Sequence, residues 1–215
     1  YVNGLFSGEI IESQGKTYLL TVMVDLSEQK IFEAELLKKS ELQNILIDLS
    51  SHYINCALEN VDNEIQLSLE KVGLFVGADR VYIFNYDFMA GVTSNTYEWC
   101  RSFIEPQIEY LQDVPLESVP DWVTAHKQGD LISIPDVSVV DGKETAVKEL
   151  LEAQGVKSLI ALPMMIAHEC IGFVGFDSVK NRRIYSENEI ELLRFYAQIL
   201  VNIHMRIVYE RKLED

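Results

Sequence analysis

The sequence lacks the short motifs that mark the commonest enzyme classes. No GxxxxGK[ST] phosphate loop, GxGxxG dinucleotide fingerprint, HExxH zinc motif or GxSxG nucleophile turn occurs in its 215 residues. Nucleotide hydrolysis, dinucleotide redox chemistry, zinc proteolysis and α/β-hydrolase chemistry therefore have no local support. We do not expect this chain to be an enzyme.

Cysteine is scarce as well. Cys56, Cys100 and Cys170 are odd in number and far apart, which argues against a disulfide framework and against a CxxC-type zinc site. The four histidines are scattered, and none has a second ligand at a metal-binding spacing. We expect no metal site, and a reducing cytoplasm as the compartment.

Basic residues are few, because 18 Lys and Arg stand against 34 Asp and Glu and give a formal net charge of -16. Such a chain repels nucleic-acid phosphates and anionic lipid headgroups. No stretch approaches the roughly 18 consecutive apolar residues of a membrane span, and the first residues carry neither the basic nor the apolar region of a signal peptide. We expect no contact of this chain with nucleic acid or membrane.

What is present is the composition of a folded globular protein, with 48% hydrophobic and 24% charged residues. The segments LFSGEIIES and KTYLLTVMVDL predict two strands joined at Ser13-Gln14-Gly15. Ser27 is predicted to be a helix N-cap, and the absence of Pro and Gly between residues 28 and 55 predicts one long helix.

The rest of the sequence predicts helices among several strands. A helix capped by Asp62 ends at Gly77, another covers GKETAVKELLEAQG, and a capping box of Ser186 and Glu189 opens the last one. Strands are predicted at DRVYIFNYD, residues 92–101, DLISIPDV, SLIALPMMI and ECIGFVGFD. Because these strands come as meanders rather than as a regular βαβ alternation, we predict an α+β fold with an antiparallel sheet.

An aromatic cluster is the best candidate for a ligand pocket. Tyr82 and Phe84 share one face of a predicted strand, and Tyr97 and Trp99 share a face of the next. Trp122 lies in an irregular segment that could close over them. Pockets for small molecules are mostly apolar, so this cluster suits one. For each residue alone, plain core packing is the alternative.

Charged residues at the ends of two apolar strands, Arg80 and Asp177, predict a structural ion pair. A rival interpretation is an enzyme that uses the pocket, with Asp177, Cys170 or His126 in its chemistry. A third is a structural spacer whose pocket is filled.

Seven segments occur in the order and spacing of a GAF domain. They are ADRVYIF, NTYEWC, EPQIEYLQDVP, PDWV, QGVKSLIALPM, CIGFVGFD and YSENEIELLRFYAQIL. Over roughly residues 40–207 the chain resembles the GAF domains of bacterial sensor histidine kinases and diguanylate cyclases. The resemblance implies an antiparallel sheet of about six strands with helices on both faces. It also implies a small-molecule site on the face that shorter helices and loops cover.

The segment GEIIESQGKTYLLTVMVDLSEQKIFEAEL resembles the end of a PAS domain, with Asp25, Leu26, Ser27 and Glu28 at the positions of the closing motif of that family. Only the last two strands of such a domain are present, so we expect no PAS ligand pocket. The two resemblances divide the chain into a PAS hairpin at 1–27, a linker helix at 28–41, a GAF domain at 42–207 and the start of an output helix at 208–215.

The chain departs from the GAF pattern at positions that some members use for their ligands or chemistry, and these departures argue against those classes of member. The chain lacks the Asn-Lys…Phe…Asp-Glu signature of cyclic-nucleotide-binding members, and neither Cys100 nor Cys170 is followed by the His of bilin-binding members. The three cysteines are predicted in a helix and two strands, whereas the methionine-sulfoxide reductases of this fold use loop cysteines. The ligand and any cofactor stay unidentified.

We therefore expect a non-catalytic sensory and dimerisation module of a multidomain bacterial signalling protein. It would bind a small ligand, relay a conformational signal through paired helices, or do both. The expected homodimer seam consists of Leu42, Ile45 and Leu49 in the first long helix and Leu200, Ile203 and Ile207 in the last.

Overall fold

The computed structural model describes residues 4–140 and 145–214. The chain divides into two compact units, Tyr1–Glu41 and Leu42–Asp215.

The first unit contains a two-stranded antiparallel hairpin. β1 (Gly4–Ser13) pairs with β2 (Lys16–Asp25) along its whole length. Gln14 and Gly15 both have positive φ, at 52° and 71°, and so form the two-residue turn that matches the right-handed twist of paired strands. The predicted hairpin is confirmed.

Both faces of this hairpin expose apolar side chains. The large ones are Leu5, Phe6, Ile10, Ile11, Tyr18, Leu19, Leu20, Val22, Met23 and Val24. A hairpin with no apolar face buried within its own unit is marginal in water.

Helix α1 (Ser27–Asn55) follows the hairpin. The backbone N–H of Ser27 donates to a carboxylate oxygen of Asp25 at 2.8 Å. The prediction of Ser27 as the N-cap was therefore wrong. Ser27 is the first helical residue, and Asp25 supplies the acceptor because an Asp side chain readily bonds a backbone N–H two residues on.

The second unit is built on an antiparallel sheet. Its described residues form six strands in the spatial order β5-β4-β3-β8-β7-β6. The strands are β3 (Arg80–Asp87), β4 (Val92–Cys100), β5 (Val114–Pro115), β6 (Ile132–Ile134), β7 (Ser158–Ile166) and β8 (Glu169–Ser178). The two-residue β5 was not predicted, because so short a segment carries no alternation that a sequence could show.

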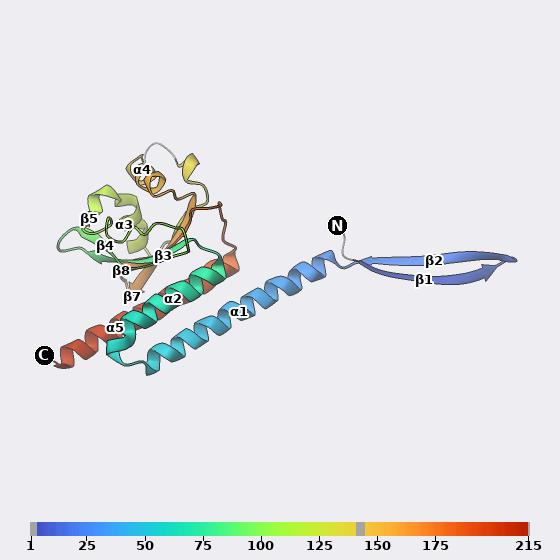
Figure 1. Ribbon diagram of the computed structural model, residues 1–215, viewed down its shortest axis with the longest axis horizontal. Helices are drawn as coiled ribbons and strands as arrows, with labels where there is room; N and C mark the ends of the chain where they lie inside the picture. The colour runs from blue at the N-terminus through green and yellow to red at the C-terminus, as the bar shows by residue number, and fades with distance from the viewer. Residues whose placement is uncertain (1–3, 141–144, 215) are drawn as a thin grey trace. The chain divides into compact units, whose positions relative to one another are not determined.

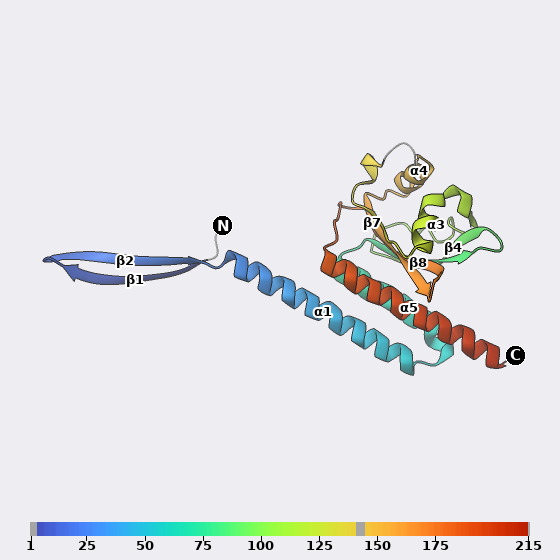
Figure 2. The same cartoon turned by 180° about the vertical axis from the view of Figure 1, so that it is seen from behind.

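Helices cover both faces of this sheet (Figure 1 and, from behind, Figure 2). α2 (Val61–Val76) and α5 (Glu187–Glu214) lie on one face. α3 (Pro120–Lys127) and α4 (Thr145–Ala153) lie on the other. The predicted architecture is confirmed, although residues 142–144 of the predicted helix GKETAVKELLEAQG lie outside the described residues.

Two apolar clusters hold these layers together. The larger one, which includes Leu46, Leu69 and Leu193, joins the sheet to α2, α5 and the part of α1 from Leu42 onward. The smaller one, which includes Trp122 and Leu151, joins the opposite sheet face to α3 and α4. A candidate site between the sheet and α3 or α4 is therefore bordered by this smaller apolar cluster, which is separate from the larger one.

Sequence signals account for several helix ends. Ser186 and Glu189 exchange backbone-to-side-chain hydrogen bonds of 3.0 and 3.3 Å, so the predicted capping box of α5 is confirmed. Gly77, in the left-handed region at φ 69°, ends α2 as predicted. Asp62 does not cap α2. It lies in the first turn, and its carboxylate accepts a hydrogen bond from Tyr97.

Candidate functional site

The two faces of β3 carry different side chains. Arg80, Tyr82 and Phe84 face α3 and α4, whereas Val81 and Ile83 belong to the larger apolar cluster. This is the alternation of an extended strand, and it places one charged and two aromatic side chains on the same face.

Between that face, α3, α4 and the segment that precedes α3 lies a partly enclosed cavity of about 60 Å³. Its wall is almost entirely carbon and includes Tyr82, Phe84, Trp122, Val147, Leu151 and Phe173. Three of the five predicted pocket residues, Tyr82, Phe84 and Trp122, therefore line one cavity.

The other two predicted pocket residues, Tyr97 and Trp99, do not lie on this face. Trp99 stands opposite Val81 on the paired strands, so its side chain points toward α2. A Cβ added to Gly73 of α2 would lie 2.7 Å from the Trp99 ring, and the Tyr97 hydroxyl donates to Asp62. The prediction was wrong because the sequence indicated that these residues share a face but not which face.

The residue of β4 that stands opposite Tyr82 and lines the cavity is Glu98, whose side chain is 2% exposed. Its carboxylate accepts hydrogen bonds from the backbone N–H groups of Gln107 (2.7 Å) and Ile108 (3.0 Å) and from the Asn95 amide (3.3 Å). These three N–H donors satisfy the hydrogen-bonding capacity of a carboxylate that is buried away from water. A glutamate between two aromatic residues of the predicted strand, Tyr97 and Trp99, was the sequence signal that could have identified it.

Arg80 is the centre of the polar end of the cavity, with a side chain only 1% exposed. Its Nε and Nη2 donate to Asp177 at 3.1 and 2.9 Å, which confirms the predicted ion pair. Nη1 donates to the carbonyl of Glu105 at 3.3 Å, and Nη2 lies 3.5 Å from the Gln154 amide oxygen. One guanidinium thus connects two strands, a loop and the segment after α4.

Tyr82 completes this network by donating its hydroxyl to Asp177 at 2.8 Å. Burial raises the pKa of Asp177, and the neighbouring Arg80 opposes that rise. Burial also raises the pKa of Tyr82, and the Asp177 charge adds to the rise, so the phenol stays protonated and can donate. Gly175 leaves room for the ring, since a Cβ there would lie 2.1 Å from it.

A second buried polar pair lies among the aromatic rings. His126 is fully buried, and its Nδ1 lies 2.7 Å from the Tyr86 hydroxyl. Burial lowers the pKa of His126 to about 4. Its ring centre is 4.9 Å from that of Phe173 and 6.1 Å from that of Trp122, so the neutral imidazole packs as a core aromatic.

The three residues considered for an enzyme do not converge. Asp177 is bonded to Arg80, His126 to Tyr86, and the Cys170 thiol donates to the Gly172 carbonyl at 3.1 Å. Burial raises the pKa of Cys170, which disfavours the nucleophilic thiolate. Within the described residues there is also no group of three or more His, Cys, Asp or Glu that could hold a metal ion.

The residues predicted for a dimer seam lie mostly inside the second unit. Leu42, Leu49, Leu200 and Ile203 are at most 5% exposed and belong to the larger apolar cluster, so they pack within one chain. They were wrongly predicted as a seam because the apolar stripe of a helix looks the same whether it faces its own core or a partner. Of the six, only Ile45 and Ile207 are partly exposed.

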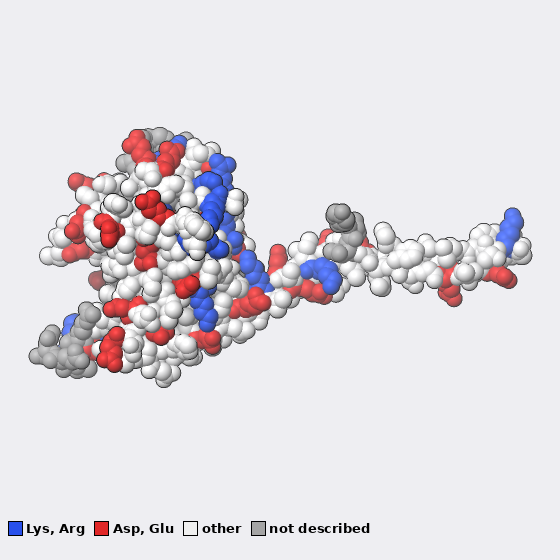
Figure 3. Space-filling model, viewed as in Figure 1, with Lys and Arg blue, Asp and Glu red and all other residues white. Residues whose placement is uncertain are grey.

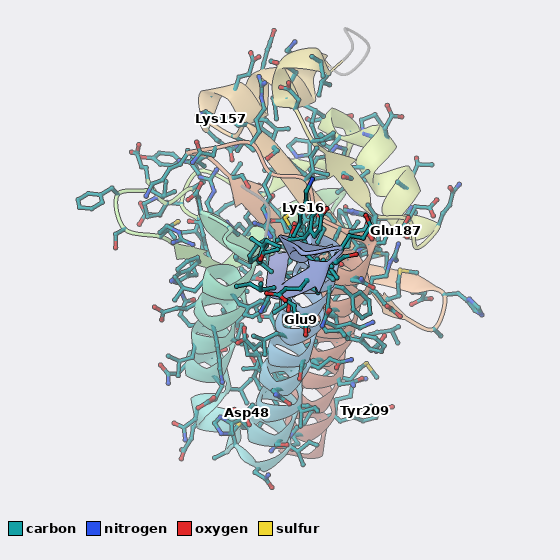
Figure 4. All side chains as sticks on the ribbon, turned by 90° about the vertical axis from the view of Figure 1, so that its right-hand side faces the viewer. Glu9, Lys16, Asp48, Lys157, Glu187 and Tyr209 are labelled. Carbon is teal, nitrogen blue, oxygen red and sulfur yellow. The ribbon has the colours of Figure 1, made fainter. Side chains whose placement is uncertain are left out.

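The part of α1 in the second unit lies beside α2 and α5 (Figure 4). Asp48 pairs with Lys71 of α2 at 3.3 Å, and the Tyr53 hydroxyl donates to the Glu64 carbonyl at 3.1 Å. Arg206 of α5 donates to the Tyr53 carbonyl at 2.6 Å. Ile47 and Ile54 remain exposed on α1. No helix of the described residues is long and apolar enough to cross a bilayer.

A six-stranded antiparallel sheet with a small cavity under the face that α3 and α4 cover defines the class of fold to which the second unit belongs. The GAF domain model matches residues 60–202, and the chain is a member of the GAF domain family.

A relative named methanogenesis regulatory histidine kinase FilI, from Methanothrix harundinacea (strain 6Ac), is 31% identical over 179 residues. That alignment covers 80% of this chain and 19% of the relative, so the chain spans about a fifth of that protein. The likeness therefore concerns one part of a much longer signalling protein.

Two solved structures illustrate the shared fold. The phycoerythrobilin-bound GAF domain of a cyanobacterial phytochrome aligns with a TM-score of 0.67 at 20% identity, over 79% of this chain and 97% of that one. The chromophore-binding domain of the Stigmatella aurantiaca bacteriophytochrome aligns with a TM-score of 0.63 at 15% identity, over 93% of this chain and 69% of that one. Identities this low establish the fold and nothing about the ligand.

Proposed function

We propose that this chain is a non-catalytic sensory and dimerisation module of a multidomain histidine kinase, which responds to a small molecule in the cavity. The observation that carries the proposal is the position of Arg80. It lies at the wall of the cavity and is bonded to Asp177 of β8 and to Gln154, directly after α4. A ligand that displaces α4 would therefore act on the central strands of the sheet.

A contiguous set of contacts continues from there to the opposite face. Phe176 precedes Asp177 on β8, belongs to the larger apolar cluster, and lies 6.4 Å from Tyr196 of α5 between ring centres. The Tyr196 hydroxyl shares a 2.6 Å hydrogen bond with Ser68 of α2. Packed side chains of this kind favour discrete alternative arrangements, and a ligand selects between them by its difference in affinity.

The setting in a longer protein is also part of the proposal. The histidine kinase named among the relatives favours such a kinase, and hence a two-component system, over a diguanylate cyclase as the parent. The exposed apolar hairpin supports its assignment as the end of a PAS domain at residues 1–27. Residues 28–41 would then be the linker helix, 42–207 the GAF domain and 208–215 the start of the output helix.

The two rival functions are less well supported. An enzyme needs a nucleophile and a base within hydrogen-bond reach of a substrate, and Asp177, Cys170 and His126 each have a separate partner. A structural spacer needs a filled pocket, and the cavity of about 60 Å³ argues against it.

The proposal is tested by filling the cavity and observing the helices. Val147→Phe adds most of a ring to the cavity wall, whereas Val139→Phe makes the same change at an exposed position outside it. We expect Val147→Phe to alter the hydrogen exchange of α1 and α5 amides in the intact chain, and Val139→Phe to leave it unchanged. Exchange confined to α4 in the first variant, with α1 and α5 as in the native chain, would contradict the proposed relay.

A further inference from the structure

We infer that the cavity takes a small, neutral molecule with a flat apolar body of about one aromatic ring, and that it excludes anions. This inference rests on the proposed function, because it names the class of ligand for that same cavity.

The shape of the wall favours a flat apolar body. The Phe84 and Phe173 rings are stacked with an interplanar angle of 4° at 4.9 Å, and the Trp122 ring stands at 69° to Phe173. Aromatic faces and edges of this kind pair with a further ring in stacked or edge-to-face geometry. Val147 and Leu151 of α4 supply the aliphatic wall.

The charge at the polar end excludes anions. Among the described residues that line the cavity, Arg80 and Glu98 are the charged ones. Asp177 pairs with Arg80 directly, and Glu98 lies 4.0 Å from the same guanidinium, so one positive charge faces two negative ones and the cluster carries a net charge of minus one. A ligand carboxylate or phosphate would have to compete with Asp177 for Arg80 and would lose its hydration without a free cation to replace it.

The volume limits the ligand to about one ring. A dry engineered cavity of about 150 Å³ holds benzene, so a cavity of about 60 Å³ admits one ring only when the side chains of its wall move outward and more than double its volume. Leu150 of α4 lines the cavity and is 38% exposed, which makes α4 the side that faces solvent. The bilins named for the solved relatives are far larger and anionic, and none of Cys56, Cys100 and Cys170 is among the lining residues.

One neutral polar group on the wall is available to a ligand. Gln154 lines the cavity, is only partly buried, and contacts Arg80 through a long 3.5 Å interaction. A weak contact of this length is readily exchanged for a ligand hydroxyl or N–H. A phenol-like molecule therefore fits both the wall and its polar edge.

A matched pair of fluorinated probes tests this inference on the intact chain. Fluorine NMR titrations would compare 4-fluorophenol, which is neutral at pH 7.5, with 4-fluorobenzoate, which is an anion of similar size. We expect saturable binding of 4-fluorophenol and at least tenfold weaker binding of 4-fluorobenzoate. Val147→Phe should abolish phenol binding and Val139→Phe should preserve it, with thermal unfolding showing that both variants are folded.

A charge variant provides an independent readout. Glu98→Gln removes one of the two negative charges and should reduce the preference for phenol over benzoate. Equal affinities of the two probes for the native chain, or phenol binding that survives Val147→Phe, overturns the inference. Binding of 4-fluorobenzoate without binding of 4-fluorophenol would contradict the inferred class of ligand. The cavity would then still be a candidate sensor site. Failure of both probes at millimolar concentration overturns the inference, whereas the proposed function is decided separately by the hydrogen exchange of α1 and α5 in Val147→Phe.

Discussion

His126 shows how a single buried side chain couples this fold to pH. Its imidazole is surrounded by Tyr86, Trp122 and Phe173, and burial lowers its pKa from 6.5 to about 4. The unfolded chain therefore binds a proton between these two values and the folded chain does not. Folding stability rises with pH across that window, is complete above pH 6.5 and is lost as the pH falls toward 4.

We predict that lowering the pH from 7.5 to 5.5 costs about 1.3 kcal/mol of unfolding free energy through His126 alone. Urea unfolding at the two pH values measures the difference in unfolding free energy. The substitution His126→Gln should remove most of that difference. His168→Gln, at an exposed turn position, is the control and should leave it unchanged. An equal pH dependence in the native chain and His126→Gln would show that the buried imidazole does not control it.

At the scale of the element, helix α5 depends on its N-terminal capping box. Replacing Ser186 by Ala removes the acceptor for the Glu189 N–H, and we expect a loss of about 1 kcal/mol of stability. Chemical denaturation measures the change. The exposed Ser102→Ala serves as the matched substitution and should alter stability by less than half as much. Equal effects of the two substitutions would mean that the box contributes nothing measurable.

Individual elements show what the sequence could and could not predict. Strands β3, β4, β7 and β8, helix α2 and the capping box followed from alternation, helical spacing and cap residues, which are local properties. The Arg80 and Asp177 pair followed from two unlike charges at strand ends. The face of Tyr97 and Trp99 did not follow, because it depends on the register between β3 and β4, and a shift of one residue exchanges the two faces of a strand.

The same limit applied to the helices. Leu42 and Leu200 were predicted to lie at a homodimer seam, because the sequence could not say whether their apolar stripes meet their own chain or a partner. Glu98 was not recognised, because its buried N–H partners at Gln107 and Ile108 come from a loop without a sequence pattern.

At the scale of the whole molecule, the proposed homodimer has to form against a net charge of -16. Acidic side chains are spread over the face of the second unit that Figure 3 shows. An apolar interface is therefore needed to offset the repulsion between the two chains. Ile47 and Ile54 suit such an interface, because they are 65% and 72% exposed. They are seven residues apart and so lie on the same side of α1.

We predict that replacing both Ile47 and Ile54 by Glu converts a dimer into a monomer, because it places like charges across the seam. Light scattering on the eluting protein measures the mass. The control replaces Leu67 and Leu74 by Glu, which are also exposed and seven residues apart but lie on α2. A dimer that survives the α1 change but not the α2 change would move the seam to α2.

The bond between Arg206 and the Tyr53 carbonyl has a consequence for protein engineering. It fixes the rotation of α5 about its own axis against the end of α1. Each residue inserted after Arg206 then turns whatever is fused downstream by about 100°, because an α-helix has 3.6 residues per turn. Chimaeric receptors built on this unit should therefore change activity with a period of about 3.6 residues in linker length, rather than decline steadily as the linker grows.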